Sequence, residues 1–193
     1  MVNEFQDQVV LITGAAGGIG AATAKLFAVD GARLALLDRN EDGLAVVAEE
    51  VKSRGAGEVL LLPVDQTNGK SVSSAIDEIT SILGEIRVLF ANAGYGQFSP
   101  FLTTSADKWE RHVNVNMTGT FNVCQRVAQA MVSAGNGGSI ILLCDPNSLG
   151  LGELNFIKIF YLIYQLVQDG YKLFQQTRCS WLNYMTSQNL LNL

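Results

Sequence analysis

A glycine-rich stretch near the start of the chain has the composition of a phosphate-binding turn. In VVLITGAAGGIGAATAKLFA, the residues Gly14, Gly18, Ile19 and Gly20 stand between a strand-like apolar run and a helical stretch. Glycines let backbone N–H groups approach a phosphate closely, and the N-terminus of the following helix adds a partial positive charge. The stretch therefore predicts a site for the pyrophosphate of a dinucleotide, although a tight turn that binds nothing could use the same residues.

An acidic residue follows the second apolar run. Asp38 closes this run in LALLDRN, where a carboxylate can accept hydrogen bonds from both ribose hydroxyls of NAD and repel the 2′-phosphate of NADP. The adjacent Arg39 could instead neutralise a 2′-phosphate. Because the acid stands at the strand end itself, the residues favour NAD over NADP as the cofactor. A helix cap or a solvated turn acid is the other reading of Asp38.

Strand-like apolar runs alternate with helical stretches over the first 144 residues. The expected strands are 9–13, 34–38, 58–64, 88–92 and 139–144, and the expected helices are 21–30, 42–54, 72–83 and 116–133. Continuous apolar strands are typical of a sheet covered by helices on both faces, and regular alternation indicates parallel βαβ units. We therefore expect an α/β fold with a doubly wound parallel sheet, Rossmann-like, with strand order 3-2-1-4-5 and ligands at the carboxyl ends of the strands.

Five motifs, in order along the chain, resemble the signatures of the short-chain dehydrogenase/reductase family. They are TGAAGGIG at 13–20, VDQTN at 64–68, ANAG at 91–94, VNVNMTGTF preceded by Trp109, and GGSII at 137–141. The resemblance implies hydride transfer between a nicotinamide dinucleotide and an alcohol or carbonyl carbon. It also implies a small-molecule alcohol or ketone as substrate and a homo-oligomer as the assembly. We expect Trp109 to pack in the core and not against a substrate.

The resemblance adds candidate functional residues to those of the turn. The added cofactor-binding candidates are Asp65, Asn92, Ala93, Gly94 and Arg126, and the catalytic candidate is Asn116, which corresponds to the family's active-site asparagine. Asp65 corresponds to the acid that contacts adenine, and Arg126 to a basic residue on the cofactor side. Simpler readings stay open: a turn acid for Asp65, a partner of loop backbone for Asn92, an N-cap for Asn116 and a solvated charge for Arg126.

The family's acid/base pair is missing from this sequence. A phenol with a pKa of about 10 is a poor base at neutral pH, so the family's catalytic Tyr has a Lys four residues later on the same helical face. None of the five Tyr residues has a Lys at that spacing. Asp145 stands where the family's Ser is expected, and Ser148 could replace that Ser only if the loop shifted by three residues. We therefore expect an NAD(P)-dependent oxidoreductase with impaired activity, or a catalytically silent dinucleotide-binding module.

The composition changes after residue 144. Residues 1–144 contain 18 Ala, whereas residues 145–193 contain none and hold 8 of the 16 aromatic residues. We expect a dinucleotide-binding domain at 1–144 and a divergent tail at 145–193, which leaves the sheet incomplete on its C-terminal side. A retained intron or a change of reading frame would also explain such a tail. Within it, 156–167 could form one buried helix or a strand.

Composition and charge argue against several classes of function. The chain has 13 Lys+Arg against 18 Asp+Glu and no basic cluster, which is unlike a nucleic-acid or anionic-membrane surface. One His and three Cys without metal-ligand spacing argue against a metal site. The acidic N-terminus is unlike a signal peptide, and the longest apolar stretch is far shorter than the roughly 20 residues of a spanning helix. The expected location is the cytoplasm, with no membrane partner.

Overall fold

The fold was analysed in a computed structural model, which describes residues 4–97 and 99–143. Within them, the strands are β1 (Val9–Thr13), β2 (Arg33–Asp38), β3 (Val59–Pro63), β4 (Ile86–Ala91) and β5 (Ser139–Leu142). The helices are α1 (Gly18–Val29), α2 (Glu41–Ser53), α3 (Gly69–Ile82), the 3-10 turn η1 (Phe101–Thr103), α4 (Ala106–Val113), the π-helical η2 (Asn114–Gly119) and α5 (Thr120–Ala134). The expectations for Ser148, for 156–167 and for the whole of 145–193 lie outside the described residues.

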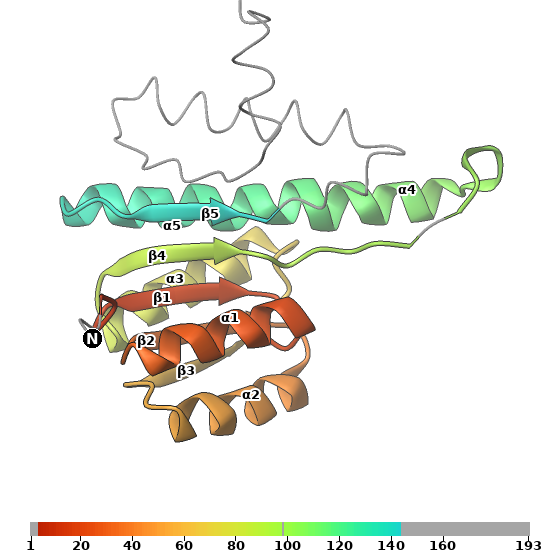
Figure 1. The fold of residues 1–193 in the computed structure, drawn as a ribbon. Helices are drawn as coiled ribbons and strands as arrows, with labels where there is room; N and C mark the ends of the chain where they lie inside the picture. The colour runs from red at the N-terminus through yellow and green to blue at the C-terminus, as the bar shows by residue number, and fades with distance from the viewer. Residues whose placement is uncertain (1–3, 98, 144–193) are drawn as a thin grey trace, which may run out of the picture.

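The strands form one parallel sheet with the order β3-β2-β1-β4-β5 (Figure 1). This confirms the doubly wound order expected from the alternation of strands and helices. In the register, Val10 of β1 lies opposite Leu34 of β2 on one side and Val88 of β4 on the other. The chain leaves β1 toward β2 and later returns to pair β4 with the opposite edge of β1, so the topology reverses beside β1. Ligands of open α/β sheets bind at the carboxyl edge of such a reversal.

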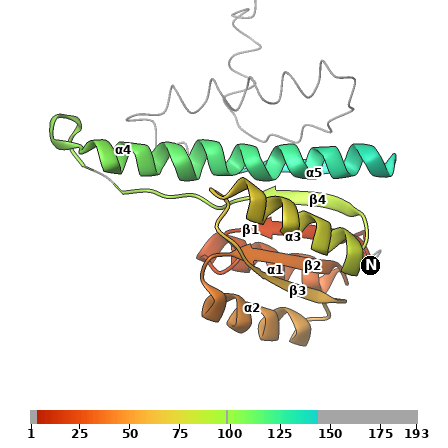
Figure 2. The same cartoon turned by 180° about the vertical axis from the view of Figure 1, so that it is seen from behind.

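Helices cover the two faces of the sheet, as the continuous apolar strands indicate. Leu11 of β1 packs in a core with residues of α3 and α5, whereas its neighbours Val10 and Ile12 pack in a second core with residues of α1 and α2. This division follows from the two-residue period of a strand, which points successive side chains to opposite faces. Figures 1 and 2 show α1 and α2 on one face and α3 and α5 on the other.

The last helical stretch differs from the expectation. A helix was expected to begin at residue 116, but α4 begins at Ala106 and continues through η2 into α5 as one rod that reaches beyond the carboxyl edge of the sheet (Figures 1 and 2). The polar stretch ADKWERHV hid this helix, since its helical faces carry few apolar residues. Trp109 was wrongly expected in the core: it is 46% exposed. Each described helix is too short or too polar to cross a membrane.

Cys124 on α5 lies in the core and has a strongly perturbed thiol. Its exposure is 1%, and burial raises the pKa of the thiol from an ordinary value of 9.0 to about 12. Because the thiolate is the reactive form, we expect iodoacetamide at pH 8 to label Cys124 at least about 100-fold more slowly in the folded chain than in urea. Mass spectrometry of the peptide that contains Cys124 measures this ratio. Equal rates would show that the α5 face is not packed as described.

The same thiol also has a consequence for stability at high pH. A folded-state pKa above the unfolded value means that the unfolded chain loses its proton first as the pH rises. The contribution of Cys124 to the free energy of unfolding is therefore complete below about pH 9 and decreases above it, up to the folded pKa of about 12.

Candidate functional site

The turn from β1 to α1 requires glycine at two positions. Gly14 has a φ of +66°, in the left-handed region that side chains rarely adopt, and Gly17 N donates a hydrogen bond to Gly14 O. A Cβ at Gly20 would lie 2.2 Å from Gly14 O and 2.9 Å from Ala15 Cα. The first turn of α1 therefore lies directly on the backbone of the loop, and this close approach allows no side chain at Gly20.

The N-terminus of α1 is open, in contrast to the other helices that begin after a loop. The capping side chains are Asn40 for α2, Asn68 for α3 and Ser105 for α4. No side chain of the described residues caps α1 at Gly17, and a Cβ at Gly18 would have no described neighbouring atom within 4 Å. Helix N-terminal N–H groups need an acceptor and favour negative charge. This end of α1 therefore has both the donors and the space for a phosphate.

Asp38 lies beside this turn, at the carboxyl end of β2. Its Oδ2 accepts a hydrogen bond from Ala16 N at 3.1 Å, and its Oδ1 accepts one from Asn40 N at 3.0 Å. The carboxylate is thus held between the turn and the start of α2. The helix-cap reading of Asp38 is wrong, because Asn40 caps α2. Arg39 is exposed. A carboxylate oxygen has two acceptor positions, so both oxygens of Asp38 can accept a further hydrogen bond.

Asp65 and Gln66 follow β3 and have different roles. Asp65 is exposed, and its Oδ1 accepts a hydrogen bond from Thr67 N at 2.9 Å, as in an Asx turn. The turn reading of Asp65 is thereby confirmed, and its contact with adenine stays a prediction. Gln66 is 5% exposed, and its Nε2 donates to Ala93 O at 3.3 Å and to Val115 O at 2.9 Å. Gln66 therefore connects the segment after β4 to the helical rod. The VDQTN motif did not predict this role.

Thr13 and Asn92 connect the carboxyl ends of β1 and β4. Thr13 is 1% exposed, and its Oγ1 accepts hydrogen bonds from Asn92 N and Ala93 N, both at 3.0 Å. The side-chain Nδ2 of Asn92 donates to Thr13 O at 3.0 Å and to Gly14 O at 3.2 Å. The reading of Asn92 as a partner of loop backbone is confirmed. These contacts fix the glycine turn relative to the Asn92–Gly94 loop at the carboxyl ends of β1 and β4.

Asn116 lies in the π-helical turn η2 and faces the same loop. Its Oδ1 accepts a hydrogen bond from Tyr95 N at 2.7 Å, and its Nδ2 donates to Tyr95 O at 2.8 Å. A Cβ at Gly94 would lie 3.4 Å from Asn116 Oδ1. The N-cap reading of Asn116 is wrong, because the helix continues through it from α4 to α5. The structure thus brings Asn116 to the end of β4, beside Asn92, Ala93 and Gly94.

Arg126 points to a neighbouring helix. Its guanidinium forms an ion pair with Asp77 of α3, and its Nε donates to Ser73 Oγ at 3.3 Å. The ion pair lies at the surface, because 28% of the Arg126 side chain and 62% of the Asp77 side chain are exposed, so the solvated-charge interpretation of Arg126 stays open. Contact between Arg126 and a cofactor stays a prediction.

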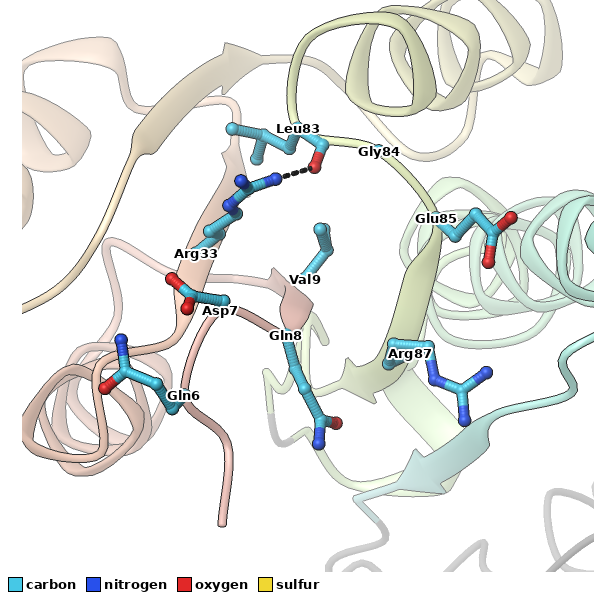
Figure 3. Close-up of a pocket in the computed structure, with 9 residues that line it drawn as sticks. All are labelled: Gln6, Asp7, Gln8, Val9, Arg33, Leu83, Gly84, Glu85 and Arg87. Atoms are coloured by element: carbon cyan, nitrogen blue, oxygen red, sulfur yellow. Dashed lines mark hydrogen bonds between the residues drawn. The ribbon is translucent and has the colours of Figure 1, made fainter. Parts of the chain in front are cut away.

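A hollow opens at the opposite, amino end of the sheet. It has a volume of about 380 Å³ and is lined by residues that include Asp7, Arg33, Glu85 and Arg87 (Figure 3). Arg33 Nη1 donates to Leu83 O at 2.7 Å, and Arg87 Nη1 donates to the backbone of the loop before β5. Both cations thus hold connections between elements. The glycine turn lies at the other edge of the sheet, so this hollow is separate from the candidate site.

Comparison with known proteins agrees with this arrangement. The sequence profile of the family described as short chain dehydrogenase matches residues 8–149. D-threitol dehydrogenase of Mycolicibacterium smegmatis is 37% identical over 147 residues, which are 76% of this chain and 56% of that protein. An uncharacterized oxidoreductase of Bacillus subtilis is 34% identical over 151 residues, 78% of this chain and 22% of that protein.

Solved structures match the same part of the chain. A short-chain type dehydrogenase/reductase from Mycobacterium marinum has a TM-score of 0.70 and 35% identity, over 73% of this chain and 57% of that one. An NAD⁺-bound xylitol dehydrogenase has a TM-score of 0.69 and 36% identity, over 72% of this chain and 53% of that one. The chain spans little more than half the length of these dehydrogenases.

Proposed function

The chain belongs to the short-chain dehydrogenase/reductase family, and we propose that it binds NAD at the carboxyl ends of β1, β2 and β4. The open N-terminus of α1 carries this proposal. Its first N–H groups have no capping side chain among the described residues, and the position of Gly18 leaves space above them. A pyrophosphate placed there would accept hydrogen bonds from these groups and interact favourably with the helix dipole.

Asp38 and the loop Asn92–Gly94, at the same carboxyl edge of the sheet, would provide the remaining contacts with the dinucleotide. Asp38 has acceptor positions left for the adenosine ribose hydroxyls, and its charge would repel a 2′-phosphate, which favours NAD over NADP. The loop Asn92–Gly94 would lie along the nicotinamide half. NAD supplies a hydride acceptor when bound. The residues around it therefore have to orient the dinucleotide and accept the proton of an alcohol.

The proposed reaction is hydride transfer between the dinucleotide and an alcohol or carbonyl carbon. When an alcohol is oxidised, its C–H hydride goes to the nicotinamide and its hydroxyl proton to a base. Asn116 is the proposed catalytic residue, but an amide cannot accept that proton, and no Tyr in the sequence has a Lys four residues later. We therefore propose that turnover by this chain is impaired, with a catalytically silent dinucleotide-binding module as the second candidate. The cytoplasmic location of the protein stays a prediction.

Two measurements separate these candidates. Isothermal calorimetry with NADH tests binding, and absence of heat at millimolar NADH would contradict both. NADH production from NAD with a panel of secondary alcohols tests turnover. A rate above that of the buffer alone would favour the enzyme, and binding without turnover would favour the silent module.

Replacing Asp38 with asparagine tests the ribose contact. The substitution keeps the shape but removes the charge, and the new amide nitrogen can no longer accept from one of the two backbone N–H groups, of Ala16 or Asn40. We expect NADH affinity to fall about tenfold, since hydrogen bonds to charged groups contribute about 1.5–3 kcal/mol. NADPH affinity should fall less, because the repulsion of its 2′-phosphate also disappears. Calorimetry with both dinucleotides measures the change in their ratio.

Glu58→Gln is the matched control for this substitution. Glu58 is exposed and precedes β3, at the amino end of the sheet, so the variant removes the same charge far from the turn. Its affinity for either dinucleotide should equal that of the unchanged chain. An Asp38→Asn protein that binds NADH as the unchanged chain does would exclude the ribose contact.

A further inference from the structure

His112, the single histidine of the sequence, lies between α4 and the segment that follows β4. Its Nδ1 is 2.8 Å from Lys108 O, one helical turn earlier, and its Nε2 is 3.2 Å from Gln97 N. The imidazole also meets the Tyr95 ring edge-on, with 4.8 Å between the ring centroids and 61° between the planes. The side chain therefore contacts both ends of the segment Tyr95–Gln97.

These two hydrogen bonds determine the tautomer of His112. A carbonyl oxygen only accepts, so Nδ1 has to carry the proton that points to Lys108 O. A backbone N–H only donates, so Nε2 has to present its lone pair to Gln97. The neutral Nδ1–H form satisfies both partners. Protonation places a second hydrogen on Nε2, which then faces the N–H of Gln97, and this bond is lost.

Helix α4 carries charged residues of both signs near His112 in the sequence: Asp107 and Glu110 as well as Lys108 and Arg111. Arg111 lies with its guanidinium carbon 4.3 Å from the centroid of the Tyr95 ring, and Lys108 is on the same helix one turn earlier. From the facing segment, the titratable group is Tyr95, whose hydroxyl donates to Gln97 Oε1. A proton on His112 would therefore add a positive charge beside Arg111 and remove an acceptor at the same time.

The contact between His112 and Gln97 lies close to the candidate dinucleotide site. Asn116 lies four residues after His112, on the same side of the helical rod, and holds the backbone of Tyr95 at both its N–H and its C=O. Asn116 and His112 thus attach the two ends of one short segment to the rod. The segment directly continues Asn92–Gly94, the loop at the end of β4.

We propose that His112 is a positioning residue, which in its neutral Nδ1–H form holds the segment Tyr95–Gln97 against α4 and on protonation releases it at Gln97. Asn116 keeps its hold on Tyr95 in both states. Binding and turnover at the site would then decrease at acidic pH, a consequence that rests on the proposed function. The contact itself belongs to the chain without ligand and can be tested alone.

Nuclear magnetic resonance of the full chain tests the contact directly. Because the sequence has one histidine, long-range ¹H–¹⁵N spectra contain a single imidazole. We expect the Nδ1–H tautomer at pH 8, and a protection factor of the Gln97 amide, corrected for the intrinsic exchange rate, that falls about fivefold between pH 8 and pH 5, as one net hydrogen bond allows. The Nε2–H tautomer at pH 8, or unchanged protection at pH 5, would overturn the proposal.

Two substitutions provide a matched comparison. His112→Gln keeps an oxygen acceptor that does not titrate, so protection of Gln97 should no longer depend on pH. His112→Phe keeps a ring against Tyr95 but has no acceptor, so protection at pH 8 should fall to the level of the unchanged chain at pH 5. A loss of protection with pH in His112→Gln, or full protection in His112→Phe, would contradict the proposal.

Two controls keep the results separate. The amides of Leu11 and Ile12 in β1 should stay protected in each protein, which confirms folding. If His112→Phe does not fold, the unchanged chain and His112→Gln still decide. NADH calorimetry at pH 8 is read independently: absence of binding there contradicts the proposed function but leaves the tautomer and the Gln97 result unaffected.

Discussion

Replacing Thr13 with valine is expected to lower the free energy of unfolding by about 3 kcal/mol, because two backbone N–H groups lose their acceptor. Thr13 Oγ1 accepts from Asn92 N and Ala93 N, and the side chain is 1% exposed. Valine has nearly the same shape, so packing is preserved and the loss comes from half-buried, unpaired donors, each worth about 1–3 kcal/mol. Urea denaturation followed by circular dichroism measures the change.

Serine at position 13 is the matched control. Thr13→Ser keeps the hydroxyl and loses a methyl group, so its cost should be about 1 kcal/mol, the value of one buried methylene-sized group. The order of stability is therefore unchanged chain, then serine, then valine. Equal stability of the valine variant and the unchanged chain would show that water replaces the hydroxyl as acceptor at the end of β4.

Replacing Gly20 with alanine is the second substitution with a large expected effect. Its Cβ would lie 2.2 Å from Gly14 O and 2.8 Å from Gly14 C, both backbone atoms that cannot rotate away. The turn and α1 have to separate, which we expect to reduce the free energy of unfolding by about 3 kcal/mol. NADH binding should become undetectable, because the donors of α1 move relative to Asp38. Thermal unfolding and calorimetry with NADH report the two effects.

Gly18→Ala separates the stability of the turn from its binding role. A Cβ at Gly18 meets no described atom within 4 Å, and alanine is the better helix former, so the melting temperature should stay the same or rise. The added methyl group points into the space assigned to the pyrophosphate, so NADH affinity should still fall by about tenfold, a change of about 1.4 kcal/mol. Normal affinity in Gly18→Ala would place the pyrophosphate elsewhere.

The order of the strands was predictable from the sequence because strands and helices alternate regularly and the central strands β1 and β2 are buried on both faces. Every residue of β1 is buried, and such an uninterrupted apolar run stands out in the sequence. The helix from Ala106 was not predictable in the same way. Its residues pack little against the sheet, so no apolar stripe marks them, and Asn116 looked like a helix start when it is the middle of a continuous rod.

Some functional residues at the carboxyl edge of the sheet were predictable from the sequence, and others were not. Glycines and Asp38 could be predicted because a close backbone approach and a charge at a strand end require particular residue types. Thr13 and Gln66 could not, since their role is to pair backbone groups from distant segments, and many residue types occur at such positions.

The pairing of β1 with β4 also determines when in folding the site can exist. Thr13 and Asn92 are 79 residues apart in the chain, and the same edge needs Asn116 from still farther along. Contacts at such sequence separation form late, because closing a long loop reduces the entropy of the chain before the contacts can compensate. A partly synthesised chain that ends before β4 has the glycine turn but not its partner loop. Tight dinucleotide binding would thus report that β1, β4 and the helical rod have come together.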